Sequence, residues 1–187
     1  MRVEGNVWKG LAAGVAGGLA ASAVMNQFQA LLGRLMEGDE RSHGAQSLQQ
    51  GSPDHGVGRE LKERGGDEEE DDAAMRLANV ISGEVLDRDL TREEKQSAGT
   101  FVHYMFGVTT GAWYGATAEG VPAITAGAGL PFGAFIWITA DEGLVPALGL
   151  SKPPTEYPLS IHAYALASHL VFGLTTEMVR RGVRRAL

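Results

Sequence analysis

The sequence of 187 residues contains no cysteine. This absence excludes disulfide bonds, thiolate metal sites, haem or iron–sulfur ligation through cysteine, and a cysteine nucleophile. Basic residues are also scarce, because 16 Lys and Arg are outnumbered by 23 Asp and Glu, for a net charge of −7. A nucleic-acid-binding surface needs clustered Lys and Arg, so no nucleic-acid partner is expected. Glycine, in contrast, occurs 26 times, about twice its usual share.

Charge is scarce outside one segment of the chain. Residues 37–97 carry 17 acidic and 8 basic side chains, whereas all other residues together carry 6 acidic and 8 basic ones. The sequence therefore divides into three regions. Residues 1–36 hold the amino-terminal flank and one apolar stretch, residues 37–97 form an acidic loop, and residues 98–187 hold the remaining apolar stretches and a basic tail.

The charge-poor stretches are long enough to cross a bilayer, because about 20 helical residues span its hydrocarbon layer of about 30 Å. They predict an all-α polytopic membrane protein with four transmembrane helices near residues 10–33, 98–118, 122–147 and 158–179. The alternative is a soluble, glycine-rich helical bundle. A soluble surface helix would show a polar face at 3.6-residue spacing, which these stretches lack, so the membrane interpretation is favoured.

The first apolar stretch also has features of a secretory signal peptide, since it contains Ala21-Ser22-Ala23 after a basic flank. Its apolar character continues through Phe28 and Leu31, beyond the potential cleavage site. We therefore expect a retained transmembrane helix.

The positions of Lys and Arg predict the orientation of the chain. Arg2 and Lys9 precede the first stretch, and Arg180, Arg181, Arg184 and Arg185 follow the last one. Basic flanks are typical of cytoplasmic ends, which places both termini in the cytoplasm and residues 37–97 outside. Four spans return the chain to its starting side, in agreement with this placement.

The acidic loop itself has several parts. Residues 38–66 are polar and glycine-rich and are expected to be mobile. The acidic run 67–72 is interpreted as a solvated linker, with a divalent-ion buffer as the less favoured alternative. An amphipathic helix is predicted near 73–88, lying against the bundle or the membrane interface. Thr91 with Glu94 three residues later is typical of a capping box, so a new helix should begin near Arg92.

Glycines recur every four residues in the first two predicted spans. Small residues at this spacing let two helix backbones approach closely in a bilayer, so spans one and two are expected to pack tightly. Pro131, with nearby Gly127 and Gly129, should interrupt span three. The predicted packing residues are Gly10, Gly14, Gly18, Gly107, Gly111 and Gly115.

A series of further motifs lies between residues 96 and 183. It comprises His103-Tyr104, Phe106, Gly111, Tyr114-Gly115, Glu119, Phe132-Gly133, Trp137, Pro146, Leu148-Gly149-Leu150, His169 to Gly173, Glu177 and Arg180-Arg181. In order and spacing this pattern resembles the YagU-like family of small bacterial inner-membrane proteins. The resemblance implies a multi-pass protein of the bacterial inner membrane, with no established catalytic activity and a role in acid tolerance.

Ionisable residues from three predicted spans share one depth. Counting about 1.5 Å per helical residue places His103, Asp141, Glu142 and His162 near the outer surface. They predict a polar site that binds protons or a metal, and the alternative is ordinary placement of charges at the interface. For any single residue the ordinary placement is favoured, and for the set the preference is weaker.

Three other ionisable residues lie deeper or at the opposite end. His169 should lie near the bilayer centre, either hydrogen-bonded to a neighbouring helix or acting as a proton relay. Glu119 and Glu177 should lie near the inner interface, with Glu177 paired to arginines of the tail at helical spacing.

Enzyme motifs are not evident in the sequence. It has no G-x-G-x-x-G, no G-x-S-x-G and no Glu-x-x-His pairs, so neither an enzyme nor a cofactor is expected. Two functions stay open. One is a non-catalytic membrane protein that acts in envelope or acid-stress homeostasis or as an accessory or assembly subunit. The other is a small transporter or proton-responsive channel. The expected partners of the protein are the lipid bilayer and either a second copy of the chain or another subunit of a membrane complex.

Overall fold

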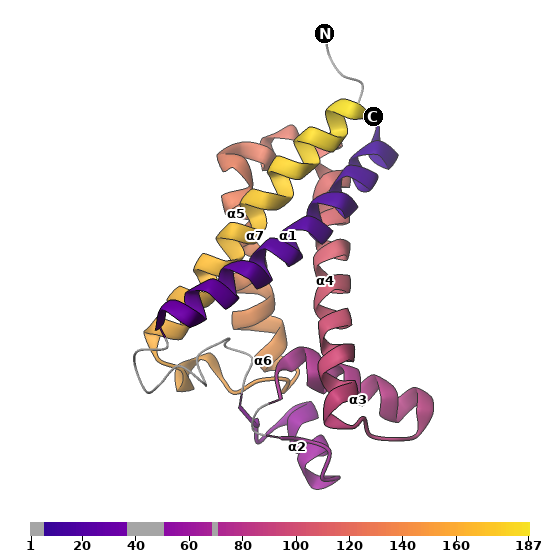
Figure 1. Ribbon diagram of the computed structural model, residues 1–187, viewed down its shortest axis with the longest axis vertical. Coiled ribbons are helices and arrows are strands. Elements are labelled where there is room, and N and C mark those ends of the chain that lie inside the picture. Colours follow the sequence, from indigo (N-terminus) through magenta and orange to yellow (C-terminus); the bar gives the residue numbers. More distant parts are fainter. Residues whose placement is uncertain (1–5, 37–50, 69–70) are drawn as a thin grey trace. The chain divides into compact units, whose positions relative to one another are not determined.

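The structure, a computed structural model, describes residues 6–36, 51–68 and 71–187 (Figure 1). Over these residues the chain is all-α and contains no strand, as predicted. The α-helices are α1 (Val7–Met36), α2 (Gly56–Glu63), α3 (Ala73–Leu86), α4 (Arg92–Gly120), α5 (Leu130–Ile136), α6 (Val145–Ala147) and α7 (Leu159–Ala186). Short 3₁₀ turns lie within Pro122–Gly129, which is kinked at Ala126, Gly127 and Ala128, and within Pro154–Glu156. A π-helix covers Trp137–Leu144.

The chain forms two compact units. Unit 1 comprises Met1–Leu32, Tyr104–Ile136 and Leu166–Leu187. Unit 2 comprises Gly33–His103 and Trp137–Ala165. Unit 2 thus combines the acidic segment with residues from the third and fourth apolar stretches.

In unit 1, α1 and α4 pack backbone against backbone through their glycines. A Cβ atom on Gly111 would lie 2.6 Å from the carbonyl oxygen of Gly14 and 2.7 Å from the Cα of Gly18. A Cβ on Gly115 would lie 2.7 Å from the Cα of Gly14 and would overlap the carbonyl oxygen of Gly10. Side chains larger than hydrogen do not fit between these backbones, so the two glycine series allow the contact.

A second close approach in unit 1 involves α5 and α7, and it was not among the contacts predicted from the glycine spacing. A Cβ on Gly173 would lie 2.6 Å from the backbone nitrogen of Gly133 and 2.8 Å from its Cα. Aromatic rings fill the adjacent space, with the Tyr114 and Phe132 centroids 4.3 Å apart and those of Phe132 and Phe172 6.0 Å apart. Glycines therefore bring four helices of unit 1 into close contact in pairs, and aromatic rings from α4, α5 and α7 pack against one another.

The third apolar stretch is not one continuous α-helix. The backbone turns at Gly127, Ala128 and Gly129, which have φ values of 72°, 55° and 87°, and α5 begins at the next residue. The predicted interruption beside Pro131 is therefore present. The π-helix after α5 was not predicted, and such segments occur frequently at functional sites.

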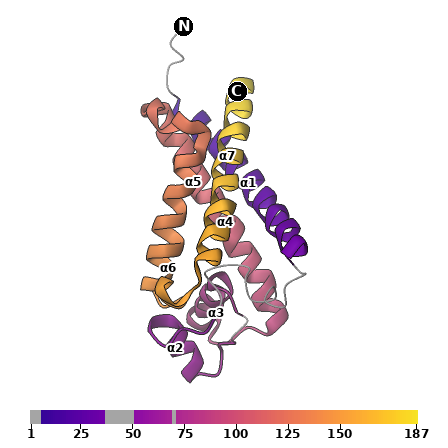
Figure 2. The same cartoon turned by 90° about the vertical axis from the view of Figure 1, so that its left-hand side faces the viewer.

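In unit 2, α2 packs against α3 (Figure 2). The side chain of Leu61 in α2 is fully buried. The amides of Val57 and Gly58 donate to the carbonyl oxygens of Leu148 and Gly149, at 3.1 and 2.7 Å. The prediction that residues 38–66 are mobile is thus wrong for residues 51–66, because backbone hydrogen bonds join this segment to the loop at Leu148 and Gly149. Residues 38–50 lie outside the described part.

The amino-terminal end of α4 follows the predicted pattern. The amide of Thr91 donates to Glu94 Oε2 at 2.9 Å, and the amide of Glu94 donates to Thr91 Oγ1 at 3.4 Å. This reciprocal capping box starts the helix at Arg92. The helix predicted near 73–88 is α3, whose first turn is capped by Asp72 accepting from the amide of Met75 at 2.8 Å.

Two segments of the described chain are long and apolar enough to cross a membrane, rather than the four predicted. They are Val7–Arg34 and Pro122–Ala147. Helices α4 and α7, with 29 and 28 residues, are long enough to cross a membrane but less apolar than these two segments. Their sequences include polar side chains such as His103 and Tyr104 in α4, and Ser168 and His169 in α7.

Candidate functional site

The best-defined pair of candidate site residues is Glu142 with His162, both in unit 2. Glu142 lies in the π-helix and His162 near the start of α7. Nδ1 of His162 lies 2.7 Å from Oε1 of Glu142, and its Nε2 lies 3.1 Å from the carbonyl oxygen of Pro154. The carboxylate and the carbonyl are both acceptors, so only the imidazolium, with two N–H donors, bonds to both at once. This geometry makes the contact sensitive to protonation.

The other two residues predicted for this site also lie in unit 2. Asp141 is in the π-helix and only 4% exposed, and His103 is half-buried in α4. The convergence of all four residues stays a prediction. Among the residues that the structure describes, no group of three His, Asp or Glu side chains could hold a metal ion. The choice between proton binding and metal binding at this site stays a prediction.

The deeper ionisable residues lie in unit 1. Glu177 is 1% exposed and accepts hydrogen bonds from Arg180 at 2.6 and 2.9 Å and from Nε of Arg181 at 2.5 Å. Glu119 accepts from Arg184 at 2.6 and 3.0 Å and from the amide of Asn6 at 2.8 Å. The pairing of Glu177 with arginines of its own helix is the one expected from spacing. The pair of Glu119 and Arg184 additionally ties α4 to α7.

His169 is buried in α7, at 7% exposed. Its carbonyl oxygen occupies the place where a Cβ on Gly133 would lie, so the residue lies at the close contact of α5 with α7. Its role as a proton relay stays a prediction.

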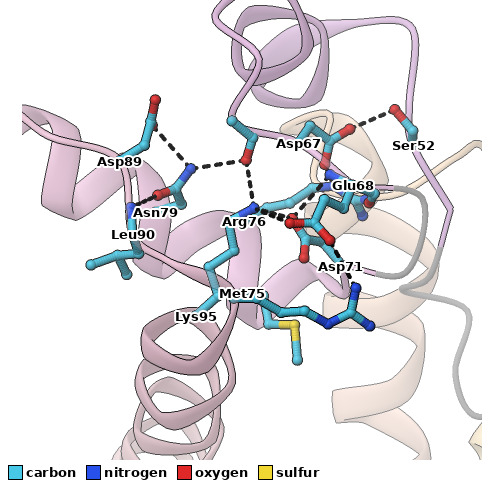
Figure 3. Close-up of polar contacts among 12 residues, drawn as sticks. Ser52, Asp67, Glu68, Asp71, Met75, Arg76, Asn79, Asp89, Leu90 and Lys95 are labelled. Atoms are coloured by element: carbon cyan, nitrogen blue, oxygen red, sulfur yellow. Dashed lines mark hydrogen bonds and ion pairs between the residues drawn. The ribbon is translucent and has the colours of Figure 1, made fainter.

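The acidic run 67–72 is not a solvated linker at Asp67 and Asp71, and the prediction is wrong for these residues. The side chains of Asp67 and Arg76 are fully buried and form an ion pair at 2.7 Å. Those of Asp71 and Lys95, 5% and 3% exposed, form a second pair at 2.7 Å (Figure 3). Burial of unpaired charge is costly, so these carboxylates enter the interior only because each has a cation beside it.

Backbone oxygens complete the same cluster. Arg76 also donates to the carbonyl oxygens of Glu68 and Leu150, both at 3.1 Å, and Lys95 donates to that of Gly66 at 2.7 Å. Next to it, the buried Asn79 accepts from the amide of Leu90 at 2.7 Å (Figure 3). We call Asp67, Asp71, Arg76, Asn79 and Lys95 the buried polar cluster of unit 2. The sequence signal for it is a single arginine within an otherwise uncharged stretch of α3, shortly after an acidic run.

Comparison with known proteins gives one family match, which covers just under half of the chain. Residues 86–178 match the model of a family described as "Protein of unknown function (DUF1440)". The matched residues include α4, α5, Glu142 and most of α7. The similarity supports a relation to an uncharacterised family, and the narrower resemblance to YagU-like proteins stays a prediction. No curated protein and no solved structure matched the chain.

Proposed function

We propose that the protein is a non-catalytic integral membrane protein with four spans, acting in envelope or acid-stress homeostasis or as an accessory or assembly subunit of a membrane complex. The observation that carries the proposal is the inverted distribution of side chains in unit 1. On α7, Thr176 and Glu177 are 0% and 1% exposed, whereas Met178 is 64% exposed. On α4, Tyr114 is 1% exposed beside Trp113 at 54%. Polar groups inside and large apolar groups outside suit a lipid surrounding.

The two most apolar segments support the same environment. Only 39% of the most apolar window in Val7–Arg34 and 28% of that in Pro122–Ala147 are buried. The core helix of a soluble protein would bury most of such a window. We therefore favour the membrane over the soluble bundle.

The same inversion accounts for the modest hydropathy of α4 and α7. Both helices have inward polar residues that lower their average, and outward faces that are apolar: Phe101, Met105, Phe106 and Trp113 on α4, and Leu159, Leu174 and Met178 on α7. Spanning helices that line the interior of a bundle carry such inward polar groups. This supports counting α4 and α7 as the second and fourth spans.

An even number of spans agrees with the position of the start of α1 and the end of α7 at the same end of unit 1. Nζ of Lys9 in α1 donates to the carbonyl oxygen of Leu187 at 2.5 Å, so the start of α1 and the end of α7 lie side by side. Basic residues gather at this end, which supports a cytoplasmic location of both termini. With the YagU-like resemblance, the membrane we propose is the bacterial inner membrane.

The topology is tested with reporter fusions after Glu63 and after Leu187, combined with extraction of membranes at high pH. The proposal expects an external reporter at residue 63, a cytoplasmic one at residue 187, and protein that only detergent releases. Release without detergent would contradict membrane insertion. A cytoplasmic reporter at 63 with an external one at 187 would contradict only the orientation.

The proposed link to acid rests on the Glu142–His162 pair. Histidine gains its charge in the range of mild acidification, so the ion pair of His162 with Glu142 would form as the external pH falls. The pair joins the π-helix to the first turns of α7, so its loss would release one contact between these segments. Acid survival should therefore fall in the variant Glu142→Gln, and fall no further in the double variant Glu142→Gln/His162→Gln. Survival equal to that of the natural protein would contradict the acid role.

A small transporter or proton-responsive channel is the second candidate, favoured by a specific observation. The buried polar residues of unit 1 lie mainly on α7, where they recur over more than three turns: Ser168, His169, Thr176, Glu177 and Arg180. Reconstituted vesicles would test this function through proton flux between about pH 5 and pH 8. A flux that exceeds that of protein-free vesicles and is abolished by His169→Leu would replace the non-catalytic proposal.

A further inference from the structure

The amphipathicity of α3 in unit 2 is the reverse of that of a soluble helix. Arg76, Asn79 and Ser82 follow one another at three-residue spacing and are 0%, 0% and 5% exposed. On the other face, Ile81 and Val85 are 49% and 73% exposed. A helix in water normally buries its apolar face and exposes its polar one. The outer face of α3 is therefore built for a surrounding other than bulk water.

The contacts of α3 place it where the proposed spans leave the bilayer. Met75 packs on Gly99, since a Cβ there would lie 3.1 Å from the Met75 backbone nitrogen and 3.3 Å from its Cα. Gly99 is the second residue of the span predicted at 98–118. Arg76 donates to the carbonyl oxygen of Leu150 at 3.1 Å, in the connection between the third and fourth spans. Both anchors of α3 thus lie at the external ends of spans.

The direction of α3 and its sequence agree with this position. Figure 1 shows α3 lying across the beginning of α4 instead of running alongside it. Among its 14 residues only Arg76 and Glu84 are charged, and Arg76 is buried. Phe101 of α4, 66% exposed, adds a large apolar side chain just past Gly99. The apolar surface of α3 is therefore accompanied by one on the helix it packs against.

We propose that α3 lies in the interface of the bilayer, with Ile81, Val85 and Leu86 inserted at the boundary between headgroups and acyl chains of the outer leaflet. This inference rests on the proposed membrane insertion. It adds to the four proposed spans a fifth helix that contacts the membrane without crossing it. Interfacial helices take this arrangement, with an apolar face buried about 5–10 Å into the boundary. The buried polar cluster keeps α3 in place by its polar side, and lipid covers the apolar side.

The absence of cysteine in the chain makes a direct test straightforward. Three single-cysteine variants, Val85→Cys, Glu63→Cys and Trp113→Cys, are spin-labelled in the full chain, reconstituted in vesicles of phosphatidylcholine and phosphatidylglycerol. Accessibility of each label is measured to oxygen, which concentrates in lipid, and to a nickel chelate, which stays in water. All three side chains are exposed, so the variants should fold. Glu63, on the exposed face of α2, is the control in water, and Trp113 is the control within a span.

The expected result is a label at 85 that oxygen reaches severalfold better than the nickel chelate, with the opposite preference at 63. Preference for the nickel chelate at 85, with oxygen preferred at 113, would overturn the interfacial helix and leave membrane insertion standing. Preference for the nickel chelate at 113 would overturn membrane insertion itself. An immobile label at 85 that neither reagent reaches would also overturn the inference, because it would indicate a protein partner such as a second copy.

Discussion

The closest packing contacts of unit 1 and unit 2 differ in kind. In unit 1 the closest contacts join glycine backbones of α1 and α4, and of α5 and α7. In unit 2 two carboxylates and two cations are buried together with backbone oxygens. Lipid gives helices no hydrophobic reason to associate, so small residues and van der Waals contact stabilise unit 1. In the segment 51–103, large apolar side chains such as Ile81, Val85 and Phe101 are exposed, and ion pairs lie in the interior. The comparison teaches that the packing interactions of each unit suit its proposed surroundings: close backbone contacts in unit 1, and paired charges in unit 2.

The largest effect is expected where the glycine contact of unit 1 is broken. The change Gly111→Leu would place a side chain against the backbone of Gly14 and Gly18, which cannot move aside without separating α1 from α4. We expect a loss of about 3 kcal/mol or more in the free energy of unfolding, at the upper end of overpacking costs. The measurement is unfolding in mixed detergent micelles.

The matched control for this change is Gly182→Leu in α7. Apart from the neighbouring backbone of α7 itself, no atom lies within 4 Å of the position that a Cβ of residue 182 would take, so the same side chain meets open space there. Equal losses at Gly111 and Gly182 would show that the glycine series does not determine the packing of unit 1.

The second effect belongs to the buried polar cluster of unit 2. Asp67→Leu leaves the buried guanidinium of Arg76 without its carboxylate and should cost about 3–5 kcal/mol, the usual penalty for breaking a buried pair. Asp67→Leu/Arg76→Met removes both charges, so its cost should be smaller than the sum of the two single changes. A double-mutant cycle measures this coupling from chemical unfolding.

The exposed pair of Lys62 with Asp54 in α2 and the preceding turn provides the control. Its side chains are 55% and 86% exposed, and exposed pairs contribute little. Asp54→Asn should therefore leave the unfolding curve unchanged. Additive losses for Asp67 and Arg76 would contradict the interpretation of the cluster as a coupled unit.

A smaller effect on stability is expected at two non-glycine residues with left-handed backbone conformation, one in each unit. Ala128 in unit 1 has φ 55°, and Asp87 in unit 2, at the end of α3, has φ 53°. Glycine adopts this conformation without strain, and Asp tolerates it better than Ala. We expect Ala128→Gly to stabilise the protein by about 1 kcal/mol and Asp87→Gly to change stability less. Thermal unfolding of both variants in the same detergent compares them, and a destabilised Ala128→Gly would contradict the strain.

The smallest effect is expected at the capping box of α4. Hydrogen bonds from Arg88 and from the amide of Thr91 lower the pKa of Glu94 from 4.5 to about 2. Since the folded pKa is the lower one, the stabilisation is present above about pH 4.5 and disappears as the pH falls toward about 2. Glu94→Gln should therefore speed amide exchange in the first turn of α4 at neutral pH, and the difference from the natural protein should shrink in acid. A difference that does not depend on pH would show that the charge of Glu94 is not responsible.

The sequence by itself determined the features that depend on local pattern. The capping box at Thr91 and Glu94, the helix over 73–86 and the interruption before Pro131 follow from residues close together in the chain. The glycine spacing likewise predicted which faces of the first two long helices pack, because a four-residue period places small residues on one side of a helix.

Only the tertiary structure decided which polar groups meet and which faces are covered. The acidic run looked solvated because its cations lie further along the chain, in α3 and α4. Residues 51–66 looked mobile because their hydrogen-bond partners, Leu148 and Gly149, are more than 80 residues away. Glu142, the partner of His162, lies in the π-helix, and the pattern of apolar residues in the sequence did not predict this π-helix. Helix α3 has the same sequence pattern whichever face is buried, and the ion pair of Arg76 with Asp67 decides that its polar face points inward.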